Sequence, residues 1–159
     1  MDDAKFTQEG RAVYETFCNA LTADDWKFNR HDEDLVITCG AKGDDLPMEF
    51  VIRVDCQRSI VSVLSRLPVT FDEDKRVDGS LAICVANHGM VHGSFDFNQG
   101  NGEVYFRLVN SFHGSKLSPS LCIYMILCAC HTIDNYNDKL LMLSKGLISL
   151  EQFIKSENG

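Results

Sequence analysis

The sequence has little positive charge. It contains 15 lysines and arginines against 23 aspartates and glutamates, which gives 159 residues a formal net charge of −8. Negative charge repels phosphate backbones and anionic membrane surfaces. The basic residues that do occur, such as Lys75, Arg76 and Lys116, form no large patch. We therefore expect neither a nucleic acid nor a membrane as the partner.

The sequence also lacks a long hydrophobic run. Its most apolar stretch, residues 121–133, includes Tyr124, His131 and three cysteines, and it is too short to cross a bilayer core about 30 Å thick. The first ten residues, MDDAKFTQEG, are acidic where a secretion signal has a basic flank and an apolar segment. We expect a cytoplasmic protein.

Cysteine is the residue type present in unusual number. The seven cysteines are an odd number and lie in apolar segments instead of framing loops, which is typical of free thiols in a reducing compartment. They are Cys18, Cys39, Cys56, Cys84, Cys122, Cys128 and Cys130. The length suits one domain over residues 1–159, and no repeat or linker divides it.

Hydrophobic periodicity predicts an α+β domain with the element order α-β-β-β-β-α-β-β-α-α. A period near 3.6 indicates an amphipathic helix, and strict alternation indicates a strand. The predicted helices cover about residues 6–21, 72–88, 121–143 and 147–154. The predicted strands cover about residues 26–28, 35–39, 48–54, 60–64, 91–97 and 104–108.

Three local details follow from residue type. Leu67-Pro68-Val69 is predicted to break the sheet, after which Thr70 or Asp72 caps the second helix. Gly89 is predicted to end that helix in the left-handed conformation. The buried side of the helix is predicted to consist of Val77, Leu81, Cys84, Val85 and His88.

The third helical region begins at Ser118-Pro119, since serine is a good N-cap and proline is tolerated at the first helical position. Its first half is apolar on nearly every side. Such a helix is either central to the core or covered by a partner. We expect Gly146 to separate it from the last short helix.

Cys128, Cys130 and His131 are candidate metal ligands, because thiolates and imidazoles are the usual zinc ligands. On a helix, successive residues turn by about 100°, so Cys128 and Cys130 point to nearly opposite sides and cannot share an ion. No second cluster supplies the missing ligands. We predict no metal and no cofactor, with the cysteines buried as small hydrophobic residues.

No set of residues indicates catalysis. Cys84 and His88 are four apart on one helix face, a spacing that allows a nucleophile and base, but they continue an apolar stripe. Gly100-Asn101-Gly102 joins two strands, as a hairpin turn does and a phosphate-binding loop does not. His92-Gly93-Ser94 and His113-Gly114-Ser115 lack the elbow that exposes a serine nucleophile. We expect no enzyme.

The acidic runs Asp44-Asp45 and Asp72-Glu73-Asp74 also carry no site. Neither has the alternating acidic residues, central glycine and closing glutamate of a calcium loop. Solvated charge at a turn and at a helix start is the simpler interpretation.

Several short motifs resemble the YbjN domain family over residues 24–143. They are Leu67-Pro68 before an acidic helix start, Asn87-His88-Gly89, Gly93-Ser94-Phe95-Asp96, Gly102-Glu103-Val104 and Phe106-Arg107. The resemblance implies a type III secretion chaperone-like fold, in which a curved, mainly antiparallel sheet packs against helices and two subunits commonly pair. The segment 147–154 and the brief stretch 67–70 depart from the family pattern.

Family members are described as proposed regulators of sensory transduction. The resemblance implies a non-enzymatic regulator or chaperone-like adaptor that binds a protein client through apolar helix and sheet-edge surfaces, and that pairs as a homodimer. The predicted contact residues are Leu121, Ile123, Tyr124 and Leu127, although the same helix could lie wholly inside its own core. The alternative is a small-molecule or metal-binding sensor that uses cysteine and histidine residues.

Overall fold

The computed structural model describes the backbone of residues 2–158 and the side chains of residues 7–158. Its helices are α1 (Asp2–Ala23), α2 (Arg76–His88), α3 (Pro119–Ser144) and α4 (Leu150–Asn158), with a short 3-10 helix η1 (Glu73–Lys75). Its strands are β1 (Phe28–His31), β2 (Val36–Lys42), β3 (Pro47–Asp55), β4 (Ile60–Thr70), β5 (Ser94–Phe97) and β6 (Glu103–Ser111). The predicted α+β class and element order are confirmed. The interior position predicted for Phe6 lies outside the described side chains.

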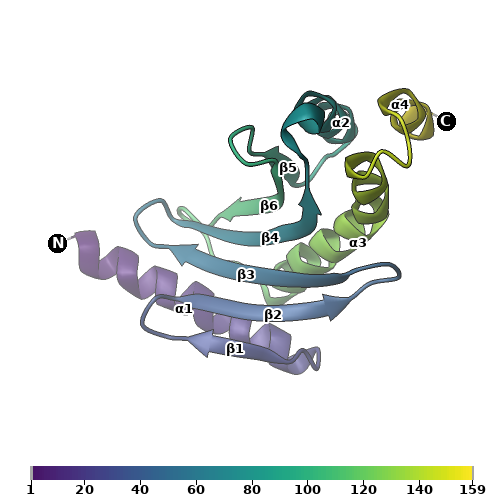
Figure 1. The fold of residues 1–159 in the computed structure, drawn as a ribbon. Coiled ribbons are helices and arrows are strands. Elements are labelled where there is room, and N and C mark those ends of the chain that lie inside the picture. The colour runs from purple at the N-terminus through teal and green to yellow at the C-terminus, as the bar shows by residue number, and fades with distance from the viewer. Residues whose placement is uncertain (1, 159) are drawn as a thin grey trace.

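The six strands form one curved antiparallel sheet in the order β1-β2-β3-β4-β6-β5 (Figure 1). Strands β1 to β4 are a meander, because each pairs with the next strand in the chain. Strand β6 then pairs with β4, and β5 becomes the other edge. Of the paired strands, β4 and β6 are therefore the two that lie farthest apart in the sequence.

Helices α1 and α3 pack against each other and against one face of the sheet (Figure 1). Alternating residues of β2, β3, β4 and β6 point into this layer and are buried, while the residues between them lie on the opposite, open face. Helices α2 and α4 pack together beside β5 and the second half of α3. The core joins both groups and includes Phe17, Phe50, Phe106, Ile126 and Phe153.

The predicted break at Leu67-Pro68-Val69 is wrong, because β4 continues to Thr70. Leu67 and Val69 stay in the period-two pattern and are buried, which keeps the strand on the sheet. Pro68 is exposed, and the pairing of β4 with β6 shifts register between Arg66 and Thr70. A proline is tolerated at such an irregularity because its missing N–H is not needed by a regular ladder.

The predicted buried side of α2 is also wrong. Helix α2 buries its small residues Gly79, Ala82 and Ala86 together with Ile83, whereas Val77 and Leu81 face outward. A Cβ on Gly79 would lie 2.9 Å from ring atoms of Phe71 and Phe97, so the helix backbone approaches these rings closely. The side with the smaller residues is buried because it allows this close packing.

The caps of α2 differ from the prediction. Asp72 precedes η1 and makes no side-chain capping hydrogen bond, and α2 itself begins only at Arg76. Gly89 has φ −92°, which is ordinary right-handed backbone and not the left-handed conformation. The structure gives no reason why this position is glycine.

The start of α3 is confirmed, since Ser118 Oγ accepts a hydrogen bond of 3.1 Å from the N–H of Leu121. Gly146, with φ +72°, ends this helical region as predicted. The other differences concern boundaries. Strand β5 begins at Ser94, so Val91 lies outside it and is 91% exposed, and α4 begins at Leu150.

Candidate functional site

The outer side of α3 carries the residues predicted to form an interface. Tyr124 and Leu127 are 46% and 49% exposed, and Leu121 and Ile123 are half-buried. The opposite side of the same helix, represented by Met125, is fully buried. Helix α3 is therefore core on one side and surface on the other, and its outer side brings Tyr124 and Leu127 together at a spacing of three residues.

A hydrogen bond fixes the aromatic side chain of this surface, Tyr124. The Tyr124 hydroxyl lies 2.6 Å from Nδ1 of His92, and the two rings meet edge to face with centroids 5.6 Å apart. Burial raises the pKa of Tyr124, and the neighbouring Cys128 raises it further, so the hydroxyl keeps its proton at neutral pH. The aromatic ring is thus held in one orientation at the surface.

Helix α2 presents a second apolar surface, which we call the α2 stripe: Val77, Leu81, Cys84 and His88. All four are exposed, with Val77 at 66% and Leu81 at 47%. Their spacing of four, three and four residues is the spacing of the contact positions in paired helices. The periodicity of the sequence correctly predicted that these residues share one face of the helix, but it wrongly predicted that this face is buried.

Three of the cysteine thiols are affected by burial, and the described cysteines belong to no metal-binding cluster. Burial raises the pKa of Cys39, Cys122 and Cys130 to about 11 in each case, so these thiols stay protonated at neutral pH and are weak nucleophiles. Across residues 7–158, no group of three or more His, Cys, Asp or Glu side chains is arranged to hold a metal. Cys128 and His131, the pair compatible by spacing, gain no further ligand.

Cys84 and His88 are exposed, and so they do not form the core pair that the sequence predicts. They line a groove of about 620 Å³ between α2 and α4, together with Glu157. The two carboxylate oxygens of Glu157 accept hydrogen bonds from Tyr136 (2.6 Å) and Lys139 (2.7 Å). This carboxylate therefore holds α4 against α3.

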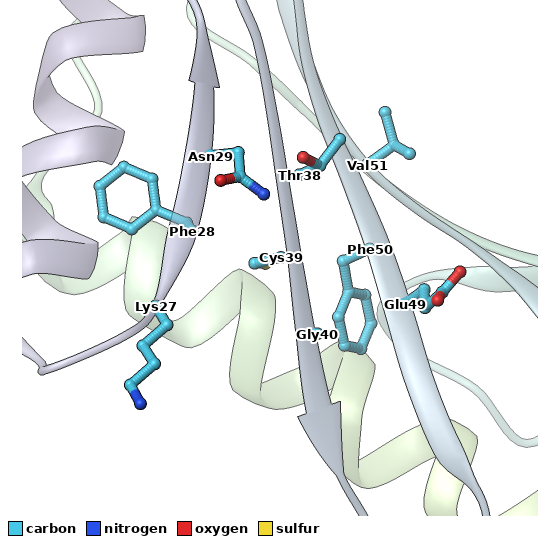
Figure 2. Close-up of a pocket in the computed structure, with 9 residues that line it drawn as sticks. All are labelled: Lys27, Phe28, Asn29, Thr38, Cys39, Gly40, Glu49, Phe50 and Val51. Atoms are coloured by element: carbon cyan, nitrogen blue, oxygen red, sulfur yellow. The ribbon is translucent and has the colours of Figure 1, made fainter.

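The open face of the sheet is hollowed at β1, β2 and β3. One hollow of about 490 Å³ lies beside Gly40, and a second of about 670 Å³ lies beside Val36; both include Thr38. Figure 2 shows Asn29, Thr38 and Val51 on one side of the sheet, with Phe28, Cys39 and Phe50 on the other. The open side is thus lined by amide, hydroxyl and aliphatic groups, and the aromatic rings belong to the layer below.

Sequence reasoning missed these hollows. They depend on which residues of three strands stand side by side, and that register is a property of the folded sheet. The one local signal is Gly40, a residue without a side chain in the middle of an otherwise regular strand.

None of the helices described is long and apolar enough to span a membrane. No family model matches the sequence, and no curated protein matches it. Solved structures do match. A chain of the HopA1–SchA chaperone–effector complex is similar with a TM-score of 0.57 and 12% identity, over 80% of this chain and 95% of that one.

A second solved structure has a similar fold. YbjN from E. coli, described as a proposed transcription regulator, has a TM-score of 0.52 and 8% identity, over 82% of this chain and 87% of its own. The similarity of fold predicted from the sequence motifs, to YbjN and to type III secretion chaperones, is therefore confirmed. The identities are far too low to transfer a residue's role.

Proposed function

We propose that residues 1–159 act as one non-enzymatic, protein-binding domain, a chaperone-like adaptor that pairs as a homodimer in the cytoplasm and holds segments of a client protein. The observation that carries this proposal is the gathering of exposed apolar side chains on the outer faces of α2 and α3. The seven cysteines, all free thiols, support a reducing compartment.

The client is assigned to the outer face of α3. Exposed apolar side chains that lie together gain free energy when a partner removes them from water. Tyr124 is already held by His92, so less conformational freedom is lost when a partner packs on it. Leu121, Ile123 and Leu127 extend the same apolar surface. Aromatic and aliphatic residues of this kind are common anchors of protein interfaces.

A variant in α3 tests client binding. The client mimic is a reduced, alkylated and permanently unfolded model protein carrying a fluorophore, and its binding is followed by fluorescence anisotropy. Leu127→Asp places a charge in the apolar surface and is expected to weaken binding at least about tenfold. Asn135→Asp adds the same charge at an exposed position of the same helix and is expected to change it little. Equal effects of the two variants would count against the proposal.

Pairing of two copies is assigned to the α2 stripe, whose spacing suits a helix–helix contact. Leu81→Asp is expected to convert the dimer to a monomer in size-exclusion chromatography with light scattering at tens of micromolar protein. Val91→Asp is the matched control, because Val91 is the more exposed residue and lies outside the stripe. A wild-type protein that is strictly monomeric under these conditions would contradict the homodimer.

The sensor alternative has a direct test in elemental analysis of the purified protein. Stoichiometric zinc or iron would favour a metal-binding sensor over the adaptor. We expect no stoichiometric metal, since burial keeps three of the thiols protonated.

A further inference from the structure

The open face of β1, β2 and β3 has the shape of a trough that runs along β2. Among the residues of β2 that face outward, Gly40, Thr38 and Val36 are small or short, and the longer Lys42 stands beyond Gly40 at the end of the strand. The flanking strands present longer side chains, except at Val51. In the register of the sheet, Asn29 and Val51 stand on either side of Thr38, and His31 and Arg53 stand on either side of Val36.

The trough has the dimensions of one extended peptide. Its walls, on β1 and β3, are two strand spacings apart, or about 10 Å. From Gly40 to Val36 it is four residues long, or about 13 Å at the rise of a strand. Thr38 lines both the hollow beside Gly40 and the hollow beside Val36, so the two hollows lie end to end along β2. Asn29 and Thr38 offer an amide and a hydroxyl at its middle, within reach of a peptide backbone lying over β2.

Arg53 stands at one end of the trough. It differs from the other arginines of the strands and their turns in its ion pairing. Arg30, Arg58, Arg66 and Arg107 each form an ion pair with a carboxylate, at 2.5–2.9 Å. Arg53 is exposed and, among the side chains described, has no ion pair. In a chain of net charge −8, an unpaired guanidinium beside a hollow is a ready site for a carboxylate from outside.

Among the described side chains, neither of the two carboxylates that line the same hollow forms an ion pair with Arg53. Of the two carboxylates that line the same hollow, Asp55 is bound by Arg58 at 2.9 Å, and Asp34 lies exposed in the turn after β1. His31 donates to or accepts from Thr38 at 3.3 Å. At the far end, the hollow is lined by one cation, Lys27, and one carboxylate, Glu49.

We propose that this trough binds an extended segment of a client protein that carries an aspartate or glutamate, with its carboxylate on Arg53. Alternate side chains of an extended chain point the same way, so the residue four positions from the carboxylate fills the space above Gly40. The residue between these two lies over Thr38 and Val51. The inference rests on the proposed function, since it names the chemistry of the client, but it uses a surface distinct from α2 and α3.

The test is an NMR titration of the ¹⁵N-labelled full chain with the peptide Ac-Glu-Thr-Thr-Thr-Leu-NH₂. We expect saturable shifts at the amides of Thr38, Gly40, Val51 and Arg53, and none at Tyr124 or Leu127. A peptide with lysine in place of the glutamate is expected to bind about three- to fivefold more weakly, the effect of an exposed charge pair. Arg53→Glu, at an exposed position that leaves the fold intact, is expected to reverse this preference.

Three results would overturn the proposal: no shift along β2, equal binding of the two peptides, or an unchanged preference in Arg53→Glu. A change of oligomeric state in Arg53→Glu would also overturn it, by assigning the trough to a second copy of the chain. Gly40→Val is expected to block the peptide by filling the hollow. The proposed function is tested separately by Leu127→Asp. This variant is expected to weaken client binding on α3 and to leave the peptide shifts unchanged.

Discussion

Gly102 ties two parts of the chain that are far apart in sequence. It has φ +77°, and a Cβ at this position would overlap the carbonyl of Phe71. The contact is mutual, because the N–H of Phe71 donates to the carbonyl of Gly102 at 2.9 Å. The end of β4 is thereby joined to the β5–β6 turn by backbone alone, which only a glycine allows.

Gly102→Ala is therefore expected to lower the free energy of unfolding by about 2–4 kcal/mol, through both the overlap and the positive φ. Gly89→Ala is the matched control. Gly89 has negative φ and no atom within 4 Å of a built Cβ, so its substitution is expected to change stability by no more than about 1 kcal/mol, in the stabilising direction. Urea midpoints measure both. Equal midpoints would contradict this account of Gly102.

Residue-level rules predicted positions that depend on their immediate neighbours. Ser118 caps α3, and Gly146 takes the left-handed conformation, because each depends on a few adjacent backbone groups. The same rule predicted a left-handed conformation for Gly89, but this residue does not adopt it. Here the chain leaves α2 in right-handed backbone, and the N–H of Met90 donates to the carbonyl of Asn87.

At the scale of the element, periodicity identified helices and strands but not which side of α2 is buried. Val77 and Leu81 are larger apolar residues than Gly79, Ala82 and Ala86, and they would be buried if hydrophobicity alone decided. Phe71 and Phe97 pack edge to face at 5.6 Å and occupy the space beneath the helix, so only a side as small as Gly79 fits over them. A single helix sequence contains no information about the partner that limits its approach.

Helix α4 is fastened by one aromatic and one carboxylate side chain. Phe153 is fully buried, and Glu157 accepts from Lys139 and Tyr136. Burial raises the pKa of Glu157, but the hydrogen bonds from Lys139 and Tyr136 together outweigh it, so the pKa lies below its ordinary value of 4.5. Burial and the hydrogen bond to Glu157 raise the pKa of Tyr136 to about 12.

This arrangement predicts a pH-dependent contribution from α4. Because the folded pKa of Glu157 is depressed, its stabilisation is present above about pH 4.5 and is lost as the pH falls through the folded value. Glu157→Gln is expected to cost about 1 kcal/mol at pH 7 and almost nothing near pH 3. Urea denaturation across this range measures the gap between wild type and variant. A gap that does not shrink in acid would contradict the role assigned to the carboxylate.

At the scale of the whole molecule, the class and order of elements could be predicted because they follow from local patterns that repeat along the chain. The short motifs around Gly93, Gly102 and Phe106 also pointed to the right fold. The trough could not be predicted, since Asn29, Thr38 and Val51 come together only when three strands adopt one register. The outer surface of α3 could be predicted in part. Its residues could be named from the sequence, but whether they are exposed or buried could not.

The sheet order also has a kinetic consequence. Strands β1 to β4 are joined by short turns, whereas β4 must wait for β6, whose Ser111 bonds the carbonyl of Ser59 across 52 positions. Closing so long a loop costs entropy before any contact repays it. The pairing of β4 with β6 is therefore expected to limit the rate of folding.

Stopped-flow folding tests this expectation. Leu108→Ala alters a buried residue of β6 that pairs with Val63 of β4 and lies outside the ladder with β5, and it is expected mainly to slow folding. Ile37→Val alters a buried residue of the meander, and it is expected mainly to speed unfolding. The reverse pattern would place the meander in the folding nucleus. A chain emerging from the ribosome also exposes the edge of β4 until β6 has been synthesised, because β6 is the strand that covers this edge.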